Sequence, residues 1–115
     1  MEKMHTFGIQ FVIRKHRIKN GEAPIYARIT VNSGRTEISV KRRINVDNWN
    51  NGKGMAKGKN PDITMLNSYL EQIRSQLTTC YQNLVVNGEL VNAVNVKNKF
   101  LGNEPTGKSV AELID

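Results

Sequence analysis

The side chains of this chain that could do chemistry are cationic and hydrogen-bonding groups placed at every second position. Tyr26, Arg28 and Thr30 alternate with apolar residues, so one face of an extended strand can be buried while the other presents these groups. Arginine, glutamine, threonine and serine read base edges or hold phosphates in DNA complexes. The candidate contacts that share this outward parity in three segments are Gln10, Arg14, Tyr26, Arg28, Thr30, Ser39, Lys41 and Arg43.

The charge of the chain favours a polyanionic partner. Up to residue 59 there are 13 Lys and Arg against 4 Asp and Glu, a net charge of +9, whereas the remainder carries 4 against 6, or −2. On the outward face of the strands Glu37 is the one acid among several cations, which a merely solvated face does not explain. We expect double-stranded DNA as the partner, because a β-ribbon fits a major groove about 12 Å wide. Lys57, in a lysine-rich loop, is a further candidate contact.

Enzyme chemistry finds little support in the sequence. His5 and His16 have no Cys, Asp or Glu cluster near them along the chain that would make a metal site or a catalytic triad. The glycines between residues 52 and 58 lack the phosphate-binding pattern of a P-loop. Cys80 falls on an apolar helical stripe and is expected to be a small core residue. We expect no catalytic residue, metal, cofactor or small-molecule substrate.

The cysteine count and the lengths of the apolar runs indicate the cellular compartment of the protein. A single cysteine excludes an internal disulfide and fits a reducing compartment. No apolar run approaches the roughly 20 residues of a membrane span, and the first residues lack the apolar core of a signal peptide. These features predict a cytoplasmic protein that does not contact a membrane.

Three segments are expected to form an antiparallel sheet over about residues 7–46, with turns at Asn20 and Gly21 and at Ser33 and Gly34. A two-residue loop at Ser33 and Gly34 predicts a register. Its inner pairs are Val31 with Thr36, Ile29 with Ile38 and Ala27 with Val40, and its outer pairs are Thr30 with Glu37, Arg28 with Ser39 and Tyr26 with Lys41. Arg42 breaks the pattern because its parity places it inside, and we expect a frayed edge, a bulge or a snorkelling stem there.

A long helix is expected to cover the inner face of this sheet. Residues 47–60 read as a loop, in which Trp49 is expected to close the end of the sheet against the helix. Asn60 is a helix cap and Pro61 a first helical residue, and they begin an amphipathic helix over about residues 61–87. The sequence therefore predicts an α+β fold, with a three-stranded antiparallel β-sheet packed on a long α-helix and a short second helix.

The second helix, about residues 92–101, is expected to cover the surplus length of the first. Its apolar residues available for packing are Val94, Phe100 and Leu101. The domain is expected over residues 1–101, followed by a linker over residues 102–108. Residues 109–115 read as the truncated start of a following domain, because Ser109 and Glu112 have the capping-box spacing.

A set of motifs runs through residues 7–101. They are FVIRK at residues 11–15, NGEAPIYARITVN at residues 20–32, RTEIS at residues 35–39, the tryptophan that ends residues 46–49, and a Lys-Gly loop before a long helix. Together they resemble the N-terminal arm-type DNA-binding domain of phage-integrase-like tyrosine recombinases from mobile elements. Residues 40–43 depart from the family pattern, which has a smaller, glycine-containing stretch there.

The resemblance implies a three-stranded sheet, with a helix behind it, that enters the major groove of arm sites near the ends of the element. It implies sequence-specific duplex binding as part of a site-specific recombinase or integrase, with other recombinase protomers as partners on DNA. The catalytic residues of the family lie in a C-terminal domain and have no counterpart here. Tyr26, Tyr69 and Tyr81 are therefore not interpreted as nucleophiles, and the chain is expected to be a non-catalytic fragment.

Two other classes of function stay open at the level of sequence. An RNA- or single-strand-binding sheet would need exposed aromatic side chains for stacking, and the outward face offers Tyr26 alone. A protein-interaction module would need an apolar patch that the helix packing leaves uncovered.

Overall fold

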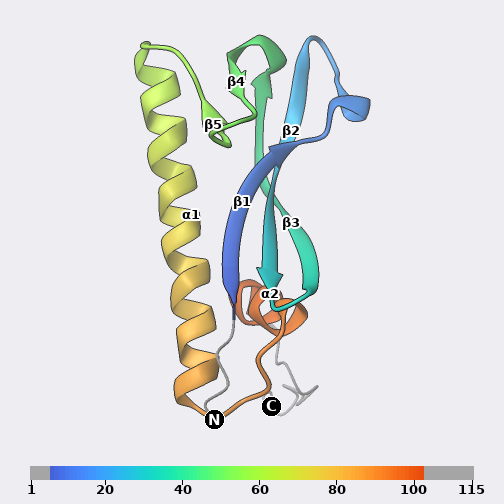
Figure 1. Cartoon of the computed structure of the whole chain (residues 1–115). Helices are drawn as coiled ribbons and strands as arrows, with labels where there is room; N and C mark the ends of the chain where they lie inside the picture. Colours follow the sequence, from blue (N-terminus) through green and yellow to red (C-terminus); the bar gives the residue numbers. More distant parts are fainter. Residues whose placement is uncertain (1–5, 103–115) are drawn as a thin grey trace, which may run out of the picture.

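The computed structural model describes residues 6–102, in which a three-stranded sheet has both helices on a single face (Figure 1). Strands β1 (Phe7–Ile13), β2 (Glu22–Val31) and β3 (Gly34–Asn45) are antiparallel and lie in the order β1-β2-β3. Helix α1 (Pro61–Val86) runs along the sheet, and helix α2 (Ala93–Leu101) lies at the end of the sheet near the β2–β3 turn. This architecture confirms the predicted α+β fold.

Helix α1 begins at the cap that the sequence indicated, and helix α2 begins at an asparagine cap of the same kind. The side chain of Asn60 accepts a hydrogen bond from the backbone N–H of Ile63 at 3.0 Å, and that of Asn92 accepts from Asn95 at 2.7 Å. Helix α2 ends at Gly102, whose φ of 85° is a left-handed conformation that glycine adopts without a steric penalty.

The core lies between the sheet and α1. Leu70, Ile73 and Leu77 of α1 are buried in one cluster with inward side chains of all three strands. The members from the strands are Phe11, Ile25, Ala27, Ile29, Val31, Ile38, Val40 and Ile44. Full burial of a valine, leucine, isoleucine or phenylalanine side chain contributes about 1.5–3 kcal/mol. The opposite face of the sheet is therefore left for the polar residues of the strands.

The turn between β2 and β3 differs from the predicted one. Val31 pairs with Gly34, so the two-residue loop consists of Asn32 and Ser33 instead of Ser33 and Gly34. Asn32 has a φ of 56°, a left-handed conformation that asparagine tolerates better than most residues. The loop thus begins one position earlier than predicted, and its left-handed residue is Asn32, not Gly34.

The predicted register is consequently wrong next to the turn. Tyr26 pairs with Ser39, and Arg28 pairs with Glu37, the acid that was expected opposite Thr30. The shift is two residues, which keeps every side chain on its expected face. The apolar pattern could not distinguish the two registers for this reason.

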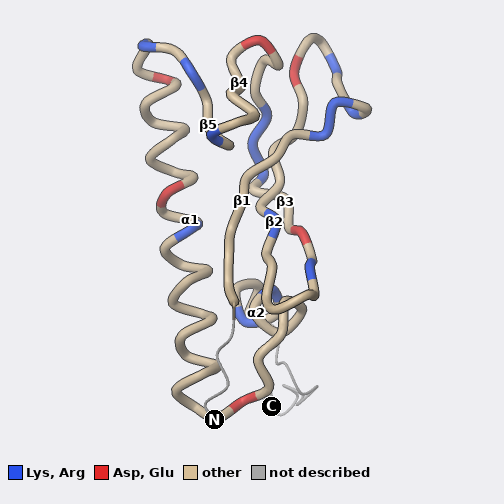
Figure 2. Tube along the Cα trace, viewed as in Figure 1, with Lys and Arg blue, Asp and Glu red and all other residues tan. Residues whose placement is uncertain are grey.

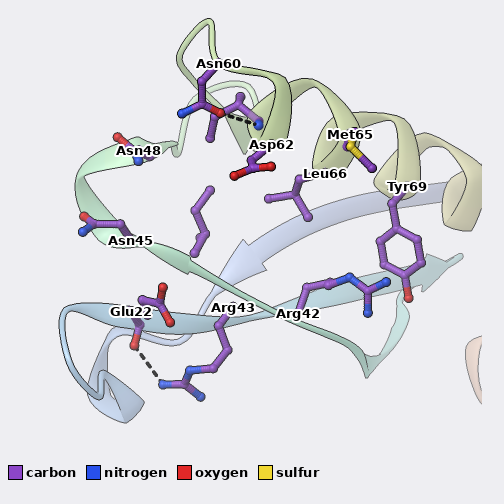
Figure 3. A pocket seen from close by; sticks show the side chains of 12 residues that line it. Glu22, Arg42, Arg43, Asn45, Asn48, Asn60, Asp62, Met65, Leu66 and Tyr69 are labelled. Atoms are coloured by element: carbon purple, nitrogen blue, oxygen red, sulfur yellow. Dashed lines mark hydrogen bonds between the residues drawn. The ribbon is translucent and has the colours of Figure 1, made fainter.

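A bulge in β3 restores the predicted register at the other end. Pro24 pairs with Arg43, so residues 40–42 of β3 lie opposite Ile25 alone. Lys41 sits in this bulge with a φ of 62°. The guanidinium of Arg42 lies over the ring of Tyr69 on α1, 4.1 Å from its centroid (Figure 3). Of the outcomes expected for Arg42, the structure therefore has the bulge.

Residues 47–60, expected to be a loop, contain a two-stranded ribbon of β4 (Trp49–Asn50) and β5 (Met55–Ala56). The side-chain amide of Asn67 on α1 donates to the carbonyl of Ala56 at 2.9 Å and its oxygen accepts from the Ala56 N–H at 3.0 Å. Trp49 is 4% exposed and belongs to the core, as the prediction of a structural plug required.

Helix α2 packs against α1 and the sheet with a different face from the one expected. Its buried apolar residues are Ala93 and Val96, whereas Val94 is 53% exposed and Leu101 is 52% exposed. Phe100 is partly buried against the core as predicted. The expected linker over residues 102–108 and the expected helix start over residues 109–115 fall almost entirely outside the described residues. Within residues 6–102, no helix is long and apolar enough to cross a membrane.

Candidate nucleic-acid interface

The outward face of the sheet carries polar side chains in rows that run across the three strands. Gln10 of β1, Arg28 of β2 and Glu37 of β3 are paired neighbours and form the central row. The rows on either side are Gly8, Thr30 and Arg35, and Val12, Tyr26 and Ser39. Seven of the predicted DNA contacts come from the strands of this face and an eighth, Arg14, directly follows β1.

Arg14, Arg28 and Glu37 meet in an ion cluster at the centre of this face. The Nε–H of Arg28 donates to Oε2 of Glu37 at 2.9 Å, and Nη2 of Arg14 donates to Oε1 of the same carboxylate. The Arg14 guanidinium also lies over the ring of Tyr26, 4.1 Å from the centroid. The cluster joins β2, β3 and the residue that follows β1, and it carries one net positive charge.

The pKa of Glu37 reflects these neighbours. Partial burial of the carboxyl group favours its neutral form, but hydrogen bonds from Arg28 and Arg14 and their positive charges outweigh this, so that the pKa is lowered. Glu37 is therefore a carboxylate at neutral pH. An acid thus lies in the middle of a surface that was expected to be cationic.

Arg43 has a structural partner that the sequence did not indicate. Its Nη2 donates to the backbone carbonyl of Arg17 at 3.0 Å and to that of Glu22 at 2.8 Å, the second of which is drawn in Figure 3. These carbonyls belong to the connection between β1 and β2, which contains a 3₁₀ turn, η1 (Lys15–Arg17). Arg43 thereby braces this connection.

The braced connection is itself basic. Figure 2 shows Lys and Arg gathered along it, and Lys15, Arg17 and Lys19 are all exposed. We did not select these residues from the sequence, because they follow no strand or helix periodicity. The signal for these residues in the sequence is the run of Lys and Arg around a turn.

The remaining predicted residues are placed as follows. Lys41 is exposed on the bulge, and its backbone N–H donates to Oγ of Ser39 at 3.0 Å. Lys57 is exposed in the connection between β5 and α1, outside the rows of the sheet. Arg35, which neighbours Thr30 on the outward face, is exposed and was missed as a candidate.

The aromatic side chains of the described residues offer little free ring surface. One face of Tyr26 is covered by Arg14, Tyr69 lies under Arg42, and Phe7 stacks on Tyr81 with centroids 4.2 Å apart. Trp49 is in the core. A platform for stacking unpaired bases is therefore not visible on this face.

The geometry of residues 6–102 gives little support to small-molecule or metal chemistry. A hollow between the end of β3 and the start of α1 is lined by Arg42, Asn45, Asp62 and Leu66 among others, and it is open to solvent (Figure 3). Within residues 6–102, no group of His, Cys, Asp and Glu side chains is placed to hold a metal ion. Burial raises the pKa of Cys80, so this thiol is protonated at neutral pH and is a poor nucleophile.

Comparison with known proteins supports DNA binding. The family model described as "Arm DNA-binding domain" matches residues 11–97, which include the three-stranded sheet from Phe11 onward, all of α1 and the first half of α2. Searches of curated proteins and of solved structures gave no significant match. The matched family binds DNA and is not by itself catalytic. With most of its length covered by that model, the chain belongs to the Arm DNA-binding domain family.

Proposed function

We propose that this chain is the arm-binding part of a site-specific tyrosine recombinase or integrase, and that it binds duplex DNA through the outward face of β1, β2 and β3. The sheet would enter the major groove, with Gln10, Arg28 and Thr30 toward base edges. Phosphates would be contacted by cations at the borders of the face, which are Arg14, Lys15, Arg17, Lys19, Arg35, Lys41 and Lys57.

The observation that carries this proposal is the central row of Gln10, Arg28 and Glu37, next to Arg14 and Tyr26. The packed core holds these side chains on strands, and both helices lie on the opposite face. Sites built on strands are held more precisely than sites on loops, as base readout requires. Arg43 is better interpreted as the brace of the β1–β2 connection than as a direct contact.

The wider arrangement is also part of the proposal. Residues 1–101 would form the arm-binding domain, residues 102–108 a linker, and residues 109–115 the beginning of a core-binding domain. The recombinase would act with other protomers on DNA, and the catalytic residues would belong to another part of that protein.

Exposed apolar side chains near the end of α1 and on α2 favour a second candidate function, interaction with a protein. Val86 is 81% exposed, Leu90 is 71% exposed and Val94 is 53% exposed, and they come from the end of α1, the following connection and α2. None of these residues belongs to the rows of the sheet, so a partner bound to them would not compete with DNA for the same residues.

A gel-shift experiment tests the proposed function. The chain is incubated with random-sequence duplex, single-stranded DNA and RNA probes of equal length at several salt concentrations. With on the order of 4 to 6 phosphates neutralised, the logarithm of duplex affinity should fall against log salt with a slope of about −4 to −5. Absence of duplex binding at low salt, or equal binding of all three probes, would contradict the proposal.

A further inference from the structure

Glu37 is an acid at the centre of a face that we propose for DNA binding. A carboxylate there repels phosphates and lowers the affinity for any duplex. Its ion pairs are partly exposed, with 31% of the Arg14 and Arg28 side chains accessible, and such pairs contribute little to stability. Neither affinity nor stability therefore explains an acid at this position.

The pairing of Glu37 has a specific geometry toward Arg28. Oε2 of the carboxylate accepts a hydrogen bond from the Nε–H of Arg28, with an N to O distance of 2.9 Å. A guanidinium has further donors on its two Nη atoms, and the described residues provide no hydrogen-bond partner for those of Arg28. Bidentate recognition of the O6 and N7 atoms of guanine needs just such a pair of free donors.

The second oxygen of Glu37 is held as well. Arg14 donates to Oε1, and the same guanidinium rests on the ring of Tyr26. The carboxylate is thus fixed from β2 and from the residue that follows β1, and it cannot turn away from Arg28 without losing its bond to Arg14. A long, flexible arginine side chain held at its Nε loses less conformational freedom when its Nη atoms bind a base.

We propose that Glu37 is a positioning residue for base readout, whose carboxylate holds Arg28 with its Nη donors free for a guanine in the major groove. This inference rests on the proposed function. Glu37 lowers the affinity for every DNA sequence, and it increases the preference for the correct sequence over others.

The proposal predicts opposite changes in two quantities. Glu37→Gln removes a negative charge from the face, so affinity for a non-specific duplex should rise. The ratio of specific to non-specific affinity should fall by about fivefold or more, at the lower end of the discrimination that one bidentate contact provides. Loss of a purely structural residue would lower both affinities and leave the ratio unchanged.

The experiment begins with selection of a preferred duplex from a randomised pool by the wild-type chain. Affinities for that duplex and for a shuffled duplex are then measured for Glu37→Gln and for Glu71→Gln. Glu71 is an exposed acid on α1, paired with Arg74, and its variant carries the same charge change away from the face. We expect Glu71→Gln to keep the wild-type ratio.

Glu37→Asp separates position from charge. It keeps the carboxylate but shortens its reach, so the ratio should fall while non-specific affinity stays at the wild-type value. This variant also carries the test if Glu37→Gln does not fold. In a double-mutant cycle, Glu37→Gln should lower the ratio no further once Arg28→Lys is present, because Glu37 acts through Arg28.

The outcomes separate the inference from the proposed function. If the wild-type chain binds its selected duplex and both Glu37 variants keep the wild-type ratio, the inference is wrong and the proposed function stands. An additive double-mutant cycle would also overturn it. If the wild-type chain binds no duplex or selects no sequence, both the proposed function and the inference are wrong.

Discussion

The hydroxyl of Tyr69 donates a hydrogen bond to the backbone carbonyl of Val40 at 2.8 Å, and so joins α1 to the bulge of β3. The same ring lies under the guanidinium of Arg42. The bulge places Lys41 and Arg43 at the border of the proposed DNA-binding face. The long helix therefore supports the sheet and also holds the irregular part of the edge strand in place.

Tyr69→Phe should lower the free energy of unfolding by about 1 kcal/mol, because the carbonyl of Val40 loses its donor while the ring and its contact with Arg42 remain. Urea denaturation measures this change. Tyr26→Phe is the matched control, since the Tyr26 hydroxyl has no hydrogen-bond partner among residues 6–102. Equal stability of the two variants would show that the hydrogen bond to the bulge contributes nothing.

Arg43→Ala should loosen the β1–β2 connection, because the carbonyls of Arg17 and Glu22 lose their shared donor. Hydrogen exchange should become faster at the amides of Ile18 and Lys19, which close this connection through backbone hydrogen bonds. Amides in α1 should keep their protection. If exchange at Ile18 and Lys19 is unchanged and DNA binding is weaker, Arg43 contacts DNA directly and does not brace the connection.

Arg28→Ala and Lys57→Ala should affect DNA binding differently. Arg28 lies in the central strand and is proposed to read a base, so its loss should cost roughly 1–3 kcal/mol of discrimination. Lys57 lies outside the rows and is proposed to contact phosphate, so its loss should weaken all duplexes about equally. Affinities for selected and shuffled duplexes test this. If the two variants behave alike, the assignment of base readout to the sheet is wrong.

Acid should remove the small contribution that the Glu37 cluster makes to stability. The folded-state pKa of Glu37 lies below its ordinary value, so the contribution is present above the unfolded pKa of about 4.3 and is lost as pH falls through the folded value. The difference in unfolding free energy between the wild-type chain and Glu37→Gln should therefore be constant near neutrality and shrink below about pH 4. Unfolding measured across this range checks the sign. A difference that grows in acid would contradict it.

The apolar pattern of a strand determines the face on which each side chain lies, but it does not determine the residue with which each one pairs. Apolar alternation placed Tyr26, Arg28 and Thr30 on one face correctly, because face depends on parity alone. Register depends on turn geometry, and the left-handed conformation of Asn32 moved it by two residues. The ion pair between Arg28 and Glu37 was hidden for this reason.

Other features had no periodic signal at all. Each strand of the β4–β5 ribbon has only two residues, too few for alternation, and the ribbon is tied to α1 by the amide of Asn67. The face of α2 that packs was also misjudged, because a helix of nine residues permits more than one apolar stripe. The caps of α1 are local, by contrast, and its start was predicted to the residue.

Binding of duplex DNA by the outward face of the sheet can be followed at each residue. The most direct measurement is an NMR titration of the isotope-labelled chain with its selected duplex, followed residue by residue. The largest amide shift changes should occur at Gln10, Arg28 and Glu37 and in the basic connection between β1 and β2. Changes concentrated at Val86, Leu90 and Val94, with the central row of the sheet unaffected, would contradict the account.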